Sequence, residues 1–175
     1  MKYAISTATM LATALLVGSP ANAQTQPTNP LDVVPDKMPW ATPYGPPISL
    51  QQAQSVLQAA VNEATKHGWP ENVAVVDSGA NLVAFVRMDG SLLASIQIAQ
   101  HKARTAVLFR RPTRAFEDAV QKSDYKYILS LDDVIASRGG VPLIEDGKLI
   151  GAIGCSGATG SQDEVICTAA AATIK

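Results

Sequence analysis

The sequence predicts an α+β fold in which helices pack on an antiparallel sheet, in the order helix, two strands, two helices, two strands, helix. Two observations support this. Two pairs of β-rich segments are each joined by a short turn, which favours antiparallel pairing. The segments between and around them carry apolar residues at helical spacing, which favours helices packed on the sheet.

The first helix is predicted over residues 50–67. Ser49 and Gln52 have the spacing of a capping box, and apolar residues recur every three or four positions after them. Gly68 suits a left-handed cap, and Pro70 prevents the helix from continuing.

Two hairpins are predicted in the remaining sequence. Residues 73–77 and 82–88 are β-rich and flank a short polar turn. Residues 141–145 and 148–155 flank Asp146-Gly147, a strong signal for a two-residue hairpin turn.

Three further helices complete the predicted fold. Ser91 is predicted to cap a helix over residues 92–109 whose two apolar stripes indicate burial between the sheet and a second surface, for example another subunit. Thr113 is predicted to cap a short helix ending near Lys122. Ser161 and Glu164 are predicted to form the capping box of the last helix. Residues 123–138 show no regular pattern.

The N-terminal residues 1–23 resemble a secretory signal peptide. Lys2 precedes an apolar run, and small residues end at Ala23, the predicted cleavage site. A membrane anchor is the alternative, but it needs about 20 apolar residues. We therefore expect a periplasmic or secreted protein with no membrane insertion after cleavage.

Residues 24–47 are rich in proline, which excludes a regular helix and predicts an extended arm. The arm is either a disordered linker or a docked segment, and Trp40 and Tyr44 favour docking for the part after Val34. Residues 48–175 then form a single domain.

Composition limits the functional classes. The net charge of −1 argues against a nucleic-acid partner, which requires a basic face. Cys155 and Cys167 are the only cysteines, and in an oxidising compartment they form either a disulfide or two buried thiols. Both interpretations stay open. Cysteine ligands alone are too few for a metal site.

Three segments carry residues suited to ligand chemistry. The glycines from Gly151 to Gly160 precede the last helix and indicate either an anion-binding turn or a tight connection, since neither GxxxxGK[ST] nor GxGxxG is present. His101 is a candidate haem-iron ligand with Lys102 nearby for propionates, and a structural or surface role is the alternative. The absence of CxxCH excludes covalent c-type haem.

The third segment is Arg87-Met88-Asp89-Gly90. Arg87 and Asp89 either pair with each other or contact a ligand. Met88 is either a soft iron ligand or a packing residue.

Four motifs occur in order: Arg87-Met88-Asp89-Gly90, residues 101–106 (HKARTA), Gly139-Gly140-Val141-Pro142, and residues 151–157 (GAIGCSG) leading to Asp163-Glu164. From Ile48 to Lys175 the chain resembles the GlcG/HbpS family of haem-binding or haem-degrading domains. The resemblance implies a profilin-like sheet, haem as cofactor, and a homo-oligomer. It supports nine motif positions: Arg87, Asp89, Gly90, Lys102, Thr105, Gly139, Gly140, Gly157 and Asp163. The predicted ligand site adds Met88, His101 and Glu164 to these, with His101 as the candidate iron ligand on the chemistry of its imidazole.

The leading hypothesis is an exported protein that binds haem or a related tetrapyrrole non-covalently, for storage, sensing or degradation. One alternative is a small-molecule enzyme or carboxylate-binding domain in which the glycine turn and Lys102 or Arg87 hold an anion. Another is an assembly module. Whether the protein is an enzyme stays open.

Overall fold

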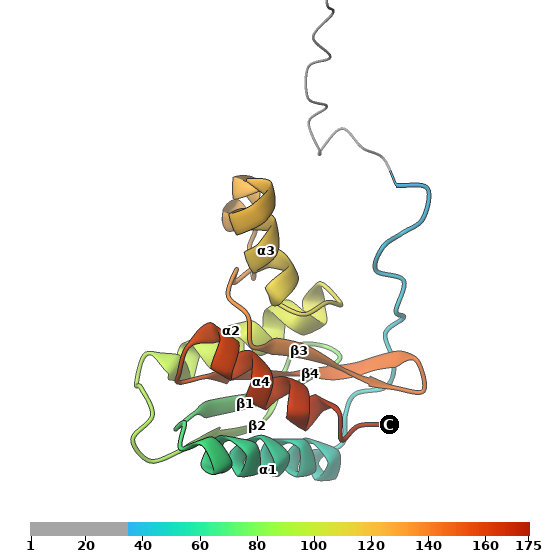
Figure 1. Ribbon diagram of the computed structural model, residues 1–175. Helices are drawn as coiled ribbons and strands as arrows, with labels where there is room; N and C mark the ends of the chain where they lie inside the picture. Colours follow the sequence, from blue (N-terminus) through green and yellow to red (C-terminus); the bar gives the residue numbers. More distant parts are fainter. Residues whose placement is uncertain (1–34) are drawn as a thin grey trace, which may run out of the picture. The chain divides into compact units, whose positions relative to one another are not determined.

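The computed structural model describes residues 35–175. Its centre is a four-stranded antiparallel sheet in the order β2-β1-β4-β3 (Figure 1). The strands are β1 (Asn72–Asp77), β2 (Leu82–Arg87), β3 (Gly140–Glu145) and β4 (Lys148–Ser156). Both predicted hairpins are present, and the predicted α+β fold with an antiparallel sheet is confirmed.

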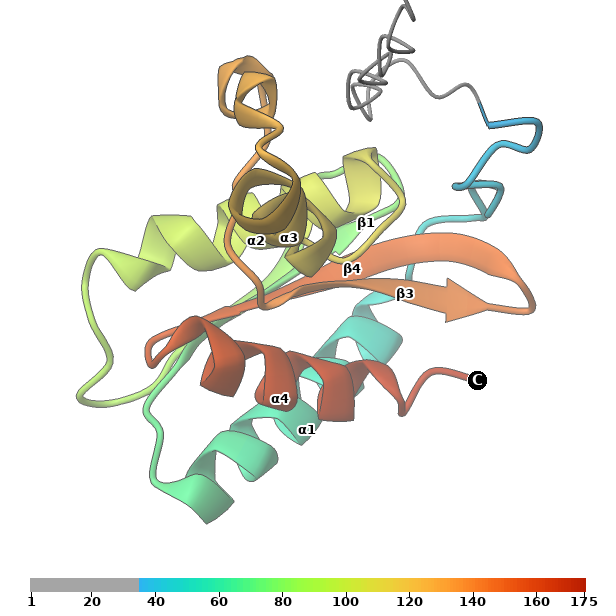
Figure 2. The same ribbon diagram turned by 45° about the horizontal axis from the view of Figure 1, so that its top comes forward.

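Helices cover both faces of the sheet (Figure 2). Helix α2 (Ser95–Leu108) packs on one face, and α1 (Leu50–His67) and α4 (Gly160–Ala171) pack on the other. The central strand β1 is buried on both sides because its residues alternate: Val73 and Val75 join the α1/α4 core, while Ala74 and Val76 join the α2 core. Each face of the sheet therefore has its own apolar core.

Helix α2 lies very close to strand β4. A Cβ atom placed on Gly154 would overlap the carbonyl oxygen of Ala99 and come within 2.6 Å of the Ala103 nitrogen. Gly154 therefore allows the two backbones to touch, and this contact fixes the height of α2 above the sheet.

The predicted ends of α1 agree with the structure. Ser49 and Gln52 form the expected capping box, and Gly68 ends the helix in the left-handed conformation, with φ 67°. The apolar face of α1 buries Ala53, Val56, Ala60 and Ala64 against the sheet and α4.

Two predicted helix starts are wrong. Helix α2 begins at Ser95 rather than 92, and Ser91 instead donates its hydroxyl proton to the Met88 carbonyl at 2.7 Å. Helix α4 has its capping box at Thr159 and Gln162, not at Ser161 and Glu164. The pairs Thr159/Gln162 and Ser161/Glu164 have the same capping-box spacing in the sequence, so only the local backbone decides which pair caps α4.

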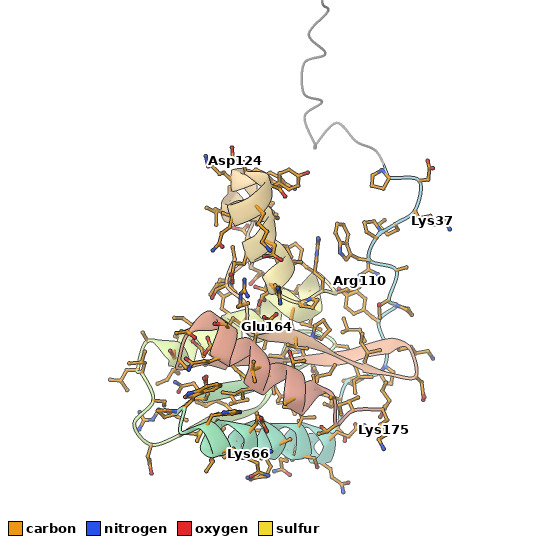
Figure 3. The ribbon with its side chains drawn as sticks, viewed as in Figure 1. Lys37, Lys66, Arg110, Asp124, Glu164 and Lys175 are labelled. Carbon is orange, nitrogen blue, oxygen red and sulfur yellow. A yellow bond between two sulfur atoms is a disulfide. The ribbon has the colours of Figure 1, made fainter. Side chains whose placement is uncertain are left out.

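Helix α3 (Arg114–Ser123) and the 3₁₀ helix Lys126–Ser130 project away from the sheet (Figure 1). Thr113 does precede α3, but its side chain makes no capping bond to the helix and accepts a hydrogen bond from the Gly140 amide at 2.9 Å. The base of α3 is fixed by an ionic network with α4, in which Glu164 takes part (Figure 3). The other members are Arg114, Glu117, Asp118 and Arg138.

The arm docks on the domain in its described part. The pairing of β1 with β4 ends at Gly151. The arm forms hydrogen bonds with the residues of β4 that precede Gly151. The Gly45 amide donates to the Leu149 carbonyl at 2.8 Å, and the Ile48 amide donates to the Ile150 carbonyl at 2.9 Å. The arm therefore continues the sheet where β1 stops.

Two aromatic residues anchor the arm to the end of α2. The Tyr44 hydroxyl donates to the Leu108 carbonyl at 2.8 Å, one of the carbonyls that a helix terminus leaves without an internal partner. The Arg111 guanidinium lies 3.4 Å from the centre of the Trp40 ring. These contacts favour the docking interpretation of the arm over that of a linker.

The predicted signal peptide and cleavage site fall outside the described residues and stay predictions. Among residues 35–175, no helix has the length and apolar character needed to cross a bilayer.

Candidate functional site

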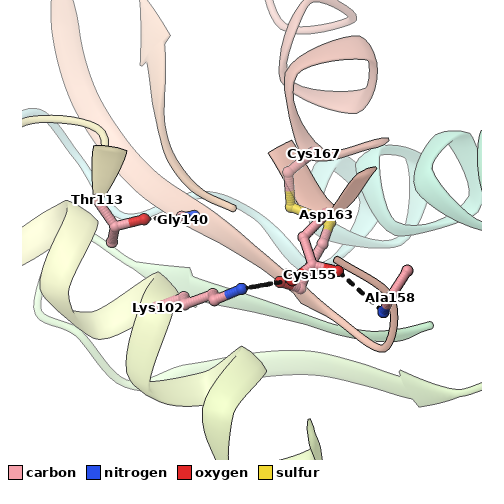
Figure 4. Close-up of a disulfide and its surroundings, with 7 residues drawn as sticks. All are labelled: Lys102, Thr113, Gly140, Cys155, Ala158, Asp163 and Cys167. Carbon is pink, nitrogen blue, oxygen red and sulfur yellow. Dashed lines mark hydrogen bonds and ion pairs between the residues drawn. A yellow bond between two sulfur atoms is a disulfide. The ribbon is translucent and has the colours of Figure 1, made fainter. Parts of the chain in front are cut away.

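A buried ion pair lies between α2 and the start of α4 (Figure 4). The Lys102 ammonium donates to Asp163 Oδ2 at 2.6 Å and to the Cys155 carbonyl at 3.1 Å. Both side chains are almost completely buried, with exposed fractions of 1% and 4%. A buried charge is tolerated only when it is paired and hydrogen-bonded, and this pair meets that condition.

The backbone around the pair explains the two glycines at the start of β3. Gly139 has φ 112°, and a Cβ there would come within 2.8 Å of Asp163 Cβ and 3.0 Å of Lys102 Nζ. A Cβ on Gly140 would overlap the Lys102 carbonyl oxygen. Gly139 and Gly140 therefore line the buried site with backbone alone, because there is no room for a side chain at either position.

Asp163 also belongs to the first turn of α4. Its second oxygen, Oδ1, accepts a hydrogen bond from the Ala158 amide at 3.1 Å. The positive end of the helix dipole favours a carboxylate at this position. Asp163 thus holds the glycine turn on one side and Lys102 on the other.

Glu71 is a third ionisable group at this site, and the sequence patterns did not reveal it. Its side chain is fully buried, and neither carboxyl oxygen attains hydrogen-bond geometry with any group in residues 35–175. The pKa of Glu71 is raised to about 9, chiefly by burial; the nearby Asp163 carboxylate contributes in the same direction, and the positive charge of Lys102 opposes the shift. Glu71 is therefore a neutral acid at pH 7. The one sequence signal was a charged residue immediately before β1.

The glycine turn after β4 lies against Glu71. A Cβ on Gly157 would overlap the Pro70 carbonyl oxygen and come within 3.1 Å of Glu71 Oε2. The turn is tied to α4 by a disulfide between Cys155 and Cys167, whose Cα atoms are 5.7 Å apart. A single rigid unit therefore carries Cys155, Gly157 and Asp163.

The Arg87–Gly90 segment lies outside the buried cluster. The Met88 amide donates to the Glu71 backbone carbonyl at 2.9 Å, while the side chains of Arg87 and Asp89 are exposed. Within the described residues Arg87 and Asp89 form no ion pair with each other. Met88 and Asp89 line an open groove of about 330 Å³ together with Trp69 and Pro70.

His101 lies on the outer face of α2, away from Lys102. It lines a second groove, of about 310 Å³, with Gln97, Gln100, Arg104 and Asp133. Arg104 reaches Asp133 at 3.0 Å and the Ala80 carbonyl at 3.1 Å. Thr105 is buried, and its hydroxyl donates to the Asp133 carbonyl at 2.6 Å.

The other histidine, His67, is already engaged. Its ring stacks on Trp69 with the centroids 4.3 Å apart, and its Nε2 lies 3.2 Å from Glu63 Oε1. Within residues 35–175, no hydrogen bond or ion pair engages His101. Of the two imidazoles, His101 is therefore the more available to a ligand.

The predicted site residues thus lie in several places instead of around one pocket. Lys102 and Asp163 form the buried ion pair, Gly139 and Gly140 lie against it, and Gly157 lies against Glu71. Met88 and Asp89 line the groove at Trp69, His101 lies on the outer face of α2, and Glu164 belongs to the ionic network of α3. No group of three or more His, Cys, Asp or Glu side chains in the described part of the chain is arranged to hold a metal ion.

An antiparallel sheet with helices on both faces, a glycine-lined lysine–aspartate pair and a separate histidine groove define a small α+β domain. Residues 48–172 match the family described as "Haem degrading protein HbpS-like". The chain belongs to this HbpS-like family.

Individual relatives agree with this assignment. Protein GlcG of Escherichia coli is 39% identical over 109 residues, which cover 62% of this chain and 81% of GlcG. The crystal structure of HbpS superposes with a TM-score of 0.70 at 30% identity, covering 75% of this chain and 92% of HbpS. The crystal structure of a PduOC:heme complex superposes with a TM-score of 0.67 at 32% identity, covering 74% of this chain and 96% of PduOC.

Proposed function

We propose that this protein binds haem or a related tetrapyrrole non-covalently, with His101 on the outer face of α2 as the axial iron ligand. The family assignment and the haem complex of the similar PduOC domain support haem as the ligand class. The His101 imidazole lines a groove and has no hydrogen-bond or ion-pair partner among residues 35–175, and this observation carries the choice of residue.

The groove has the groups that haem requires. A neutral imidazole is a common ligand of haem iron, and an arginine pairs well with propionate carboxylates. Arg104 follows His101 by three positions, so both side chains lie on the same side of the helix, and a propionate would replace Asp133 as the partner of Arg104. Ala94, Ile98 and Leu108 lie at helical spacing from His101 and add apolar surface.

A groove of about 310 Å³ is at the small end of the usual range for ligand pockets, about 300 to 1,000 Å³. We therefore expect part of a bound tetrapyrrole to lie over the apolar surface of α2 outside the groove. This surface is also where a second subunit would pack, as the two apolar stripes of the helix suggest.

The alternative anion site at the glycine turn is less well supported. The amides before α4 are already used by side chains of the same segment: Ala158 donates to Asp163, and Thr159 donates to Gln162. Lys102 is likewise held by Asp163. An anion at this turn would have to displace these bonds.

The proposal includes export to the periplasm or the medium. It is supported by the signal-like residues 1–23 and by the disulfide, which persists in oxidising compartments. Sequencing the N-terminus of the protein recovered from a cell envelope fraction tests it. A mature chain beginning at Gln24 is the expected result.

Titration with hemin, followed at the Soret band, tests the ligand and its site. We expect a saturable shift at one site per chain, which His101→Ala abolishes or displaces. His67→Ala is the matched control, because it removes the other imidazole, and it should leave the spectrum unchanged. A spectrum that responds to His67→Ala and ignores His101→Ala would move the iron to the groove at Trp69. No saturable shift would exclude haem as the ligand.

A further inference from the structure

The buried cluster contains the groups needed to join two side chains covalently. Lys102 supplies an amine, Asp163 a carboxyl group, and Glu71 a neutral acid, all shielded from water. The proposed haem site is on the outer face of α2 and uses none of them. A cluster buried so completely calls for an explanation of its own.

The reacting atoms are close. Lys102 Nζ is 2.6 Å from Asp163 Oδ2, and since a carboxyl C–O bond is about 1.2 Å long, Nζ lies within about 4 Å of the Asp163 carboxyl carbon. Reacting atoms in productive arrangements are about 3 to 3.5 Å apart. The backbone walls at Gly139 and Gly140 and the disulfide beside Asp163 hold both side chains in place. Folding therefore brings the amine and the acid together, so the reaction itself does not carry this entropy cost.

The surroundings also suit the transition state. The Ala158 amide lies 3.1 Å from Asp163 Oδ1, so it can stabilise negative charge that develops on this oxygen. The Cys155 carbonyl accepts a hydrogen bond from Lys102 Nζ at 3.1 Å and orients the amine. Glu71 is fully buried and close enough to Asp163 for the charge of one to affect the other.

We propose that Lys102 and Asp163 condense to an intramolecular amide bond, with Glu71 as the proton-transfer group. A proton first passes from the Lys102 ammonium to Asp163, giving a neutral amine and a neutral acid. Nζ then attacks the carboxyl carbon and forms the C–N bond. Glu71 protonates the departing Oδ2, the C–O bond breaks, and water leaves. Glu71 recovers its proton from the amide nitrogen, so the net change is the loss of one water molecule.

Burial favours each part of this sequence. A low dielectric disfavours the ammonium and carboxylate forms relative to the neutral amine and acid, which lowers the cost of the first proton transfer. Exclusion of water opposes hydrolysis of the product. The product would link α2 to the first turn of α4, next to the disulfide that already links β4 to α4.

Mass spectrometry of the folded, disulfide-bonded protein tests the proposal. We expect an intact mass lower by one water molecule than the mass calculated from the sequence and the disulfide. Trypsin should fail to cleave after Lys102, and digestion should release a branched peptide that joins Lys102 to Asp163. The full calculated mass in folded protein would overturn the proposal. So would a dehydrated Asp163 that is not linked to Lys102, because it indicates a cyclic imide.

The variant Glu71→Gln tests the proton transfer, since it keeps the size of the side chain and removes the acid. General acid–base catalysis contributes about 100-fold or more, so the freshly purified variant should keep the full mass. Circular dichroism and an intact disulfide must show that it is folded. Glu63→Gln, on the exposed side of α1, is the control and should lose the water as the wild type does. Equal water loss in folded Glu71→Gln would overturn the role of Glu71.

Discussion

Glu71 makes the stability of this protein depend on pH in an unusual direction. Its pKa is about 9 in the folded state against 4.5 for an ordinary glutamate, chiefly because it is buried. An acid whose pKa is higher in the folded than in the unfolded protein lowers the free energy of unfolding at every pH at which it is ionised in the unfolded chain. The cost begins near pH 4.5, grows as the pH rises, and reaches its full value near pH 9.

The magnitude follows from linkage. One pKa unit corresponds to about 1.4 kcal/mol, so at pH 7 the cost is about 3 kcal/mol, and above pH 9 it is about 6 kcal/mol. Replacing Glu71 with glutamine removes the ionisation and keeps the volume. In protein whose intact mass shows that Lys102 and Asp163 are not linked, the variant should therefore be more stable than the wild type at pH 7, and the difference should disappear near pH 4.

Urea unfolding at several pH values between 4 and 9, with the disulfide intact, measures this difference. Glu63→Gln is the control. Hydrogen bonds from Lys66 and His67 hold the pKa of Glu63 below its usual value, so the opposite and smaller trend is expected. Parallel pH profiles for the wild type and Glu71→Gln would refute the reasoning, since they would mean that Glu71 is ionised at little cost in the folded protein.

Three further predictions concern the framework around the site. Reduction of the disulfide, which closes a loop with a sequence separation of 12, should lower the free energy of unfolding by about 3 kcal/mol in urea titrations, and an unchanged midpoint would contradict it. Gly140→Ala should cost about 1 to 3 kcal/mol, because the added methyl group overlaps the Lys102 carbonyl; a wild-type melting temperature would show that α2 can move aside. Tyr44→Phe removes the hydrogen bond to Leu108 and should cost about 1 kcal/mol, while amide exchange should become faster in residues 43–48; exchange that stays slow would show that the backbone contacts suffice.

The fold was predictable because its signals are local. The α1 helix carries its own cap, its apolar stripe and its terminating glycine within 20 residues of sequence, and Asp146-Gly147 specifies a hairpin turn without help from the rest of the chain. Where two equivalent local signals competed, as at Thr159 and Ser161, the sequence offered no basis for choosing. The start of α2 was misplaced for a related reason, since Ser91 bonds to the preceding strand instead of the helix.

The site was less predictable because it depends on contacts between distant segments. Lys102 and Asp163 are 61 residues apart, and their pairing follows from the crossing of α2 with the end of β4, which no periodicity encodes. Glu71 gave less signal still, since a glutamate before a strand is ordinarily exposed. Its burial results from the turn at Gly157 lying over it.

The docked arm has a consequence for how the chain behaves if its N-terminal part is lost. Residues 43–48 satisfy backbone groups of Leu149 and Ile150 that β1 does not reach. A chain shortened to begin at Ser49 would leave these groups open on a β-strand. Open strand edges recruit other strands, so proteolytic trimming of the arm would create a point of attachment for neighbouring molecules and promote aggregation at high concentration.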